Sequence, residues 1–71
     1  MLQTRLIDSW EEVVGQAVAR YTGEKFIRNQ TLFVKVNRPA LRSELGMMQN
    51  TLVSRLNQRV GAQIITAIRF Y

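Results

Sequence analysis

The sequence predicts an α+β domain of element order α-β-β-α-β, a two-layer sandwich in which two helices pack on one face of a three-stranded mixed sheet. Three observations lead to this fold class. Apolar residues recur at helical spacing in residues 2–21 and again in residues 39–60. Two β-rich runs separated by a two-residue turn lie between these segments. A β-branched run over residues 63–71 follows the second segment.

The first predicted helix ends where Thr22-Gly23 places a glycine at the C′ position. Ser9 and Glu12 have the spacing of a capping box, which would begin a new helix at Ser9 and leave Leu2–Asp8 as a separate turn. Gly15 would weaken a continuous helix by about 1 kcal/mol relative to alanine. We favour a single helix, kinked near Gly15. Its apolar stripe is formed by Leu6, Trp10, Val13, Val14, Ala17 and Tyr21, with Trp10 expected in the core.

A β-hairpin follows, with strands at Lys25–Arg28 and Thr31–Asn37. The two residues between them, Asn29 and Gln30, are a plausible tight turn. Residues directly opposite each other in such a hairpin share a face of the sheet. The expected pairs are Phe26 with Phe33 and Ile27 with Leu32.

The second helix is predicted to begin at Pro39, since proline is tolerated in the first turn, and to end at Gly61. Its apolar stripe is formed by Leu41, Leu45, Met48, Leu52 and Leu56. The opposite side is mostly neutral and polar, so no continuous basic stripe runs along this helix. The final run, Gln63–Tyr71, reads as a strand throughout.

Strand alternation divides the sheet into an inner face and an outer face. Leu32, Val34 and Val36 are expected to face the helices. The outer face then carries aromatic rings interleaved with cations, namely Phe26, Arg28, Phe33, Lys35, Arg69 and Tyr71. Ile65 and Ala67 join the same face if the last strand begins at residue 63.

Composition argues against an enzyme and against most metal sites. The chain of 71 residues, long enough for one domain over residues 1–71, has neither cysteine nor histidine. The usual general bases and strong nucleophiles are therefore missing, and so are the commonest zinc ligands. The glycines are isolated, so there is no phosphate-binding loop. We expect no catalytic residue, no metal and no cofactor.

The net charge of +5 is unevenly distributed. Arg5 against three acidic residues leaves residues 1–19 at −2, whereas nine basic residues against Glu24 and Glu44 leave residues 20–71 at +7. Such a basic body attracts phosphate groups. No apolar run approaches the roughly 20 residues needed to span a bilayer, and the beginning of the chain lacks signal-peptide character. We expect a cytoplasmic domain with no membrane contact.

The order and spacing of several short segments resemble the DciA family of bacterial replicative-helicase loaders. The resemblance covers nearly the whole chain. It rests on residues 10–15, Ala19, residues 21–22, residues 32–36, residues 41–45, residues 56–57, Gly61 and residues 68–70.

The resemblance implies a KH-like fold, affinity for DNA and contact with the hexameric replicative helicase. Many relatives have a tryptophan where this chain has Leu41, and relatives usually continue beyond this core. The Gly-x-x-Gly loop that clamps the backbone in RNA-binding KH domains is missing, because Gly46 stands alone within a predicted helix. An ordinary KH mode of RNA reading is therefore not expected.

Three functions are considered, and the absence of histidine and cysteine argues against the third, a small hydrolase. The first is weak, non-specific binding of a DNA or RNA backbone by Arg28, Lys35, Arg38, Arg42, Arg55 and Arg69. In this hypothesis the arginines at the start of the second helix hold a phosphate with the free backbone N–H groups there. The second is a protein interface or homodimer contact formed by Phe26, Phe33, Ile65 and Tyr71.

Overall fold

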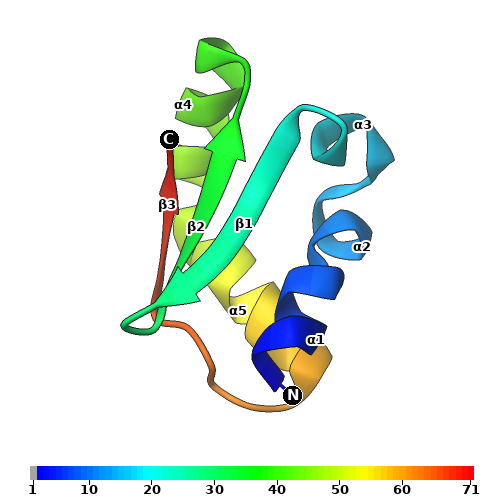
Figure 1. Ribbon diagram of the computed structural model, residues 1–71, viewed down its shortest axis with the longest axis vertical. Helices are drawn as coiled ribbons and strands as arrows, with labels where there is room; N and C mark the ends of the chain where they lie inside the picture. Colours follow the sequence, from blue (N-terminus) through cyan, green and yellow to red (C-terminus); the bar gives the residue numbers. More distant parts are fainter. Residues whose placement is uncertain (1) are drawn as a thin grey trace.

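The computed structural model describes residues 2–71 and has two layers, a three-stranded sheet and a layer of helices that covers one of its faces (Figure 1). The α+β class is confirmed. The elements in chain order are α1 (Leu2–Asp8), α2 (Trp10–Val14), α3 (Gln16–Ala19), β1 (Thr22–Arg28), β2 (Thr31–Val36), α4 (Pro39–Met47), α5 (Gln49–Val60) and β3 (Ala67–Phe70).

The sheet is mixed and has the strand order β1-β2-β3. β1 and β2 are antiparallel, and the predicted pairs of Phe26 with Phe33 and Ile27 with Leu32 are confirmed. Asn29 and Gln30 form the turn with φ values of 52° and 61°. Positive φ at both positions matches the right-handed twist of the two strands. β3 pairs parallel with β2, and this pairing requires the long crossover through α4 and α5.

The first helical segment consists of three short helices, so the prediction of one kinked helix is wrong. The alternative, a separate Leu2–Asp8 segment followed by a new helix after Ser9, is confirmed, although Ser9 has helical dihedral angles and makes no side-chain cap bond. Its hydroxyl instead donates to the carbonyl oxygen of Arg5 at 2.8 Å. Gly15 ends α2 with φ 90° and ψ 157°, a conformation that is essentially restricted to glycine.

β1 begins three residues earlier than predicted, at Thr22 instead of Lys25. Thr22-Gly23 therefore belongs to the sheet and does not end the helix. Thr22 pairs with Val36 of β2, which extends the sheet to this residue. Its side chain is also bonded to the helical layer, since the indole Nε1 of Trp10 donates to Thr22 Oγ1 at 3.1 Å. The Thr22 hydroxyl in turn donates to the carbonyl oxygen of Ala19 at 2.7 Å. The register between β1 and β2 shifts between Thr22 and Lys25.

The second helical segment is interrupted at Met48, which separates α4 from α5 with φ −97° and ψ 10°. Its predicted boundaries hold, because α4 begins at Pro39 and Gly61 ends α5 in the left-handed conformation. The Gly61 N–H donates to the carbonyl oxygen of Asn57 at 2.9 Å.

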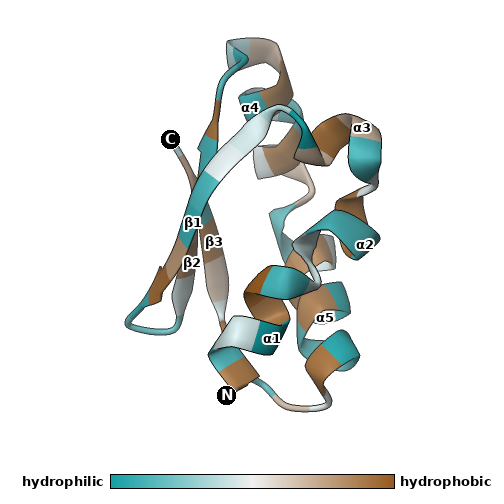
Figure 2. Ribbon diagram, turned by 45° about the vertical axis from the view of Figure 1, so that its right-hand side comes forward, coloured by the Kyte–Doolittle hydropathy of each residue, from teal (hydrophilic) through white to brown (hydrophobic). Residues whose placement is uncertain are grey.

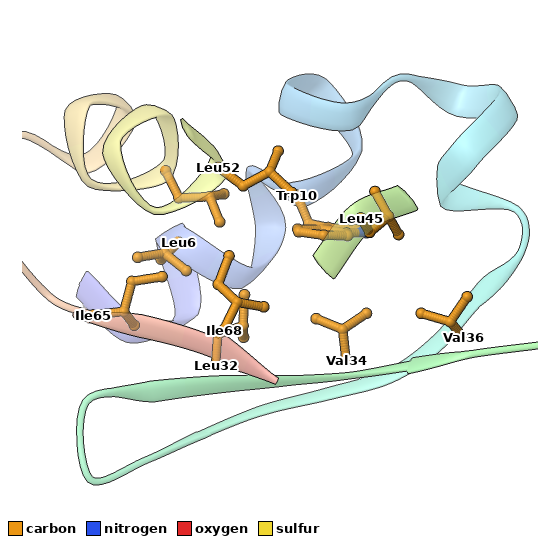
Figure 3. Packing of buried hydrophobic residues seen from close by; sticks show 10 residues of the cluster. Leu6, Trp10, Leu32, Val34, Val36, Leu45, Leu52, Ile65 and Ile68 are labelled. Carbon is orange, nitrogen blue, oxygen red and sulfur yellow. The ribbon is translucent and has the colours of Figure 1, made fainter. Parts of the chain in front are cut away.

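The core lies between the sheet and the helices, and Trp10 fills its centre with 1% of its surface exposed (Figure 3). Figure 2 shows apolar stretches on both layers. The buried residues are Leu6, Trp10, Leu32, Val34, Val36, Leu45, Leu52, Leu56, Ile65 and Ile68.

The last strand is shorter than predicted, covering Ala67–Phe70 and not the whole of Gln63–Tyr71. The backbone of Ile64 and Ile65, in the loop before β3, is bonded to the side chain of Asn57 and does not pair with β2. The Asn57 Nδ2 donates to the Ile65 carbonyl oxygen at 2.9 Å, and its Oδ1 accepts from the N–H groups of Ile64 and Ile65 at 2.9 and 3.2 Å. The loop turns Ile65 into the core, so its predicted place on the outer sheet face is wrong.

Candidate functional site

The outer sheet face is the side of the sheet that points away from the helices. Its residues follow from the register, because Leu32, Val34 and Val36 of β2 are buried on the inner side. Tyr71 extends the face beyond β3, since its backbone bonds to the Val34 carbonyl and the Val36 N–H place it beside Lys35. The face comprises Phe26, Arg28, Thr31, Phe33, Lys35, Ala67, Arg69 and Tyr71.

An aromatic cluster occupies the middle of this face. The rings of Phe26 and Phe33 are stacked, with centroids 4.9 Å apart and planes 14° from parallel. The Tyr71 ring is tilted against Phe26 at a centroid distance of 6.4 Å. Phe26 is 37% exposed and Tyr71 43%, so the cluster offers ring surface to solvent. Such rings provide apolar contact area with a preferred stacking geometry.

Three cations surround the aromatic cluster, one from each strand. Arg28 is in β1, Lys35 in β2 and Arg69 in β3, and all three are exposed. Arg69 lies beside Phe33 in the pairing of β2 with β3, so the row from β1 to β3 reads Phe26, Phe33, Arg69. Alternation and hairpin register therefore place these cations next to aromatic rings, as predicted from the sequence.

Glu24 offsets part of this positive charge, and the sequence reasoning missed it. The Tyr71 hydroxyl donates to Glu24 Oε1 at 3.3 Å, although 47 residues separate them in the chain. The pKa of Tyr71 is raised, mainly by desolvation of its hydroxyl and further by the negative charge of Glu24 and by this hydrogen bond. Since the contact depends on the long-range pairing of β3, no local sequence signal identifies it.

Arg38 and Arg42 lie at the start of α4 and already have partners within the fold. The Arg38 guanidinium lies 4.2 Å from the centre of the Tyr21 ring, which is a cation–π contact. Arg42 is half-buried and donates from Nη2 to the carbonyl oxygen of Val36 at 3.5 Å. Its Nε is buried without a hydrogen-bond partner among residues 2–71. Arg42 thus packs against the end of β2, and Arg38 remains exposed for an anion.

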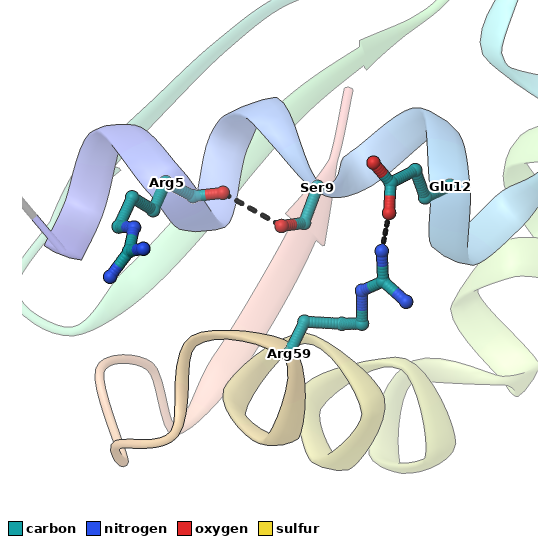
Figure 4. Close-up of polar contacts among 4 residues, drawn as sticks. All are labelled: Arg5, Ser9, Glu12 and Arg59. Carbon is teal, nitrogen blue, oxygen red and sulfur yellow. Dashed lines mark hydrogen bonds and ion pairs between the residues drawn. The ribbon is translucent and has the colours of Figure 1, made fainter.

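Arg55 is not part of the outer sheet face, because it lies on α5 in the helical layer, beside Val13, Leu52 and Thr51. The neighbouring Arg59 forms an ion pair with Glu12 of α2 (Figure 4). The basic residues of the chain therefore do not form one surface. Arg28, Lys35 and Arg69 are brought together with the aromatic cluster, whereas Arg55 is separated from them.

Other site classes are not represented in the described part of the chain. Residues 2–71 contain no group of three acidic, histidine or cysteine side chains that could hold a metal ion. Across the same residues no helix combines the length and the apolarity that crossing a bilayer requires.

Comparison with known proteins identifies the family. The family model described as "Dna[CI] antecedent, DciA" matches residues 1–70. A UPF0232 protein of Corynebacterium glutamicum (strain R) is 33% identical over 63 residues, which are 89% of this chain and 35% of that protein. The chain thus spans about a third of the length of this curated relative. The match over almost every residue shows that the chain belongs to the DciA family.

Proposed function

We propose that this domain is a non-catalytic, nucleic-acid-binding part of a replicative-helicase loader in the bacterial cytoplasm. Membership of the DciA family supports the role in replication. The observation that carries the binding mode is the outer sheet face, where the stacked Phe26 and Phe33 rings are surrounded by exposed cations of all three strands. We expect the binding to be weak and independent of sequence.

The geometry favours a single strand over a duplex. Stacking of a base on an aromatic ring contributes about 1–3 kcal/mol and needs the face of the base, which is not accessible within a double helix. Arg28 follows Phe26 by two residues along β1, and Arg69 lies beside Phe33 on β3, so the cluster has a cation next to it on each of these strands. A strand whose bases contact the rings would therefore place phosphates near Arg28 and Arg69.

Fluorescence anisotropy with a labelled oligothymidylate of about 20 nucleotides tests this mode, since a domain of this size covers fewer nucleotides than that. The logarithm of the binding constant should fall with the logarithm of salt concentration, by about 0.7 for each phosphate contact. Arg69→Gln and Arg28→Gln should each reduce the magnitude of that slope by about 0.7, the contribution of one phosphate contact. Arg55→Gln removes the same charge from the helical layer and should leave the slope unchanged.

Undetectable or salt-independent binding would contradict this function, and so would an equal effect of all three substitutions. The proposed contact with the replicative helicase is tested separately. The full-length protein should retain the helicase of its own organism in a pull-down, with nuclease added to remove association through DNA.

A second candidate function is self-association through the same face. The exposure of Phe26 and Tyr71 favours it, because aromatic rings are enriched in protein interfaces. Sedimentation velocity of the wild type and of Phe33→Ser/Tyr71→Ser decides this point. Dimers that disappear in the double variant, with an unchanged circular dichroism spectrum, would support a homodimer. A wild type that remains monomeric at high concentration would exclude it.

A further inference from the structure

The helical layer contains a groove that the proposed function does not use. It has a volume of about 500 Å³. No residue of the sheet lines it, so it is separate from the outer sheet face. Its walls are formed by residues of α2, α3, α4 and α5, namely Val13, Val14, Val18, Leu41, Glu44, Leu45, Met47, Met48, Thr51, Leu52 and Arg55.

The groove lies between the two interrupted helical segments of the chain. The break at Gly15 separates Val14 of α2 from Val18 of α3, and both valines remain half-buried. On the opposite wall the break at Met48 leaves two methionines in solvent, since Met47 is 87% and Met48 48% exposed. Apolar side chains exposed beside an apolar groove indicate a surface that a partner covers. Methionine is frequent on such surfaces because its flexible side chain adapts to what it contacts.

The charges at the groove are of opposite sign and lie on the two sides of the break. Glu44 belongs to α4 and Arg55 to α5. Neither residue forms an ion pair within residues 2–71, whereas the nearby Arg59 is paired with Glu12. The groove therefore offers one acidic and one basic side chain that can pair with opposite charges on a ligand.

We propose that the groove binds one amphipathic helix of a protein partner. The apolar face of this helix contacts the valines and methionines, a basic side chain at one end pairs with Glu44, and an acidic side chain at the other end pairs with Arg55. Docking of a helix in an apolar groove is a common mode of peptide recognition.

The same observations argue against a nucleic acid in the groove. A phosphate backbone needs several cations, and Arg55 is the only cation among the residues that line it. Glu44 would repel phosphate. The proposal does not depend on the function of the outer sheet face, because the two surfaces belong to different layers and share no residue.

Two synthetic helices of about 14 residues, roughly four turns, serve as probes. Both carry leucine at helical spacing on one face. The first has glutamates in its first turn and lysines in its last turn, and the second has glutamates in both. Binding is measured by titration of the methyl signals of the protein in NMR spectra. We expect the wild type to bind the first peptide about threefold more tightly than the second, which is the effect expected of an exposed ion pair.

Glu44→Lys should reverse this preference, because both ends of the groove are then basic. Met47→Asp should weaken both peptides tenfold or more without changing the fold, since Met47 is almost fully exposed. Leu2→Asp is the matched control, as Leu2 is an exposed apolar residue outside the groove. It should leave both affinities unchanged.

Three outcomes would overturn the proposal. The first is a peptide preference that Glu44→Lys does not change, and the second is a set of perturbed methyl signals outside the groove. The third is a dimer that Met47→Asp dissociates and that excludes the peptides, which would make a second copy of the chain the occupant. None of them affects the salt dependence of oligonucleotide binding, so this test and that of the outer sheet face fail independently.

Discussion

The indole Nε1 of Trp10 donates a hydrogen bond of 3.1 Å to Thr22 Oγ1, which joins the centre of the helical layer to the beginning of the sheet. Trp10 is 1% exposed, so its N–H has lost its access to water and depends on this acceptor. The Thr22 hydroxyl in turn donates a hydrogen bond to the carbonyl oxygen of Ala19 at the end of α3. The Thr22 side chain thus provides a partner both for the buried Trp10 N–H and for the Ala19 carbonyl oxygen at the end of α3.

Thr22→Val should destabilise the domain by about 1–3 kcal/mol, because it leaves the buried Trp10 N–H without an acceptor. Urea unfolding followed by tryptophan fluorescence measures this change directly. Thr4→Val, on the exposed side of α1, is the control and should change the free energy of unfolding by less than about 0.5 kcal/mol. Equal stability of the two variants would show that the Trp10 bond contributes nothing.

Asn57→Ala should cost about 3 kcal/mol, since it removes three hydrogen bonds to the backbone of Ile64 and Ile65. Asn57→Asp keeps the acceptor for both N–H groups but loses the donor to the Ile65 carbonyl, so its effect should be intermediate. Asn50→Ala, at an exposed position of α5, provides the baseline. Hydrogen exchange at the Ile64 and Ile65 amides should accelerate selectively in Asn57→Ala, which removes their acceptor, and should change little in Asn57→Asp.

Two glycine-to-alanine substitutions should have opposite effects. Gly15→Ala forces a side chain into φ 90° and should destabilise the domain by about 1–3 kcal/mol, although no atom lies within 4 Å of the added methyl group. Gly46→Ala lies within α4, also with open space around it, and should stabilise the domain by up to about 1 kcal/mol. Thermal or urea unfolding of the two variants checks this sign difference.

The phenol of Tyr71 should ionise at a higher pH than an ordinary tyrosine, because its pKa is raised. Folding favours the neutral form, so the resulting stability is present below the ordinary pKa of about 10 and is lost as pH rises through the higher pKa of the folded state. The ultraviolet absorbance of phenolate, measured in a Tyr21→Phe background, reports Tyr71 alone. Glu24→Gln should lower this pKa, and an unchanged titration curve would contradict the contact.

Local chemistry determined which features could be predicted. The hairpin register follows from the two turn residues, Asn29 and Gln30, and the strand alternation then places Phe26 and Phe33 on the outer sheet face. The end of α5 follows from Gly61, since glycine readily takes the left-handed conformation.

Long-range contacts determined what the sequence did not reveal. Alternation of apolar residues from Gln63 onward indicated a strand, but the side chain of Asn57 binds this backbone and turns Ile65 into the core. Thr22 likewise joins the sheet through its pairing with Val36 of β2, beyond the register shift between Thr22 and Lys25. Contacts of this kind join one segment to another, so periodicity within one segment contains no information about them.

The parallel pairing of β3 with β2 has a consequence for when the outer sheet face becomes complete during folding. A parallel partner cannot be reached through a tight turn, so the hairpin can form early, whereas β3 can join only after the crossover helices have closed a long loop. Arg69 and Tyr71 arrive with this last strand. The complete surface of aromatic rings and cations is therefore absent from partly folded chains, and a ligand that requires all three strands recognises only molecules that have finished folding.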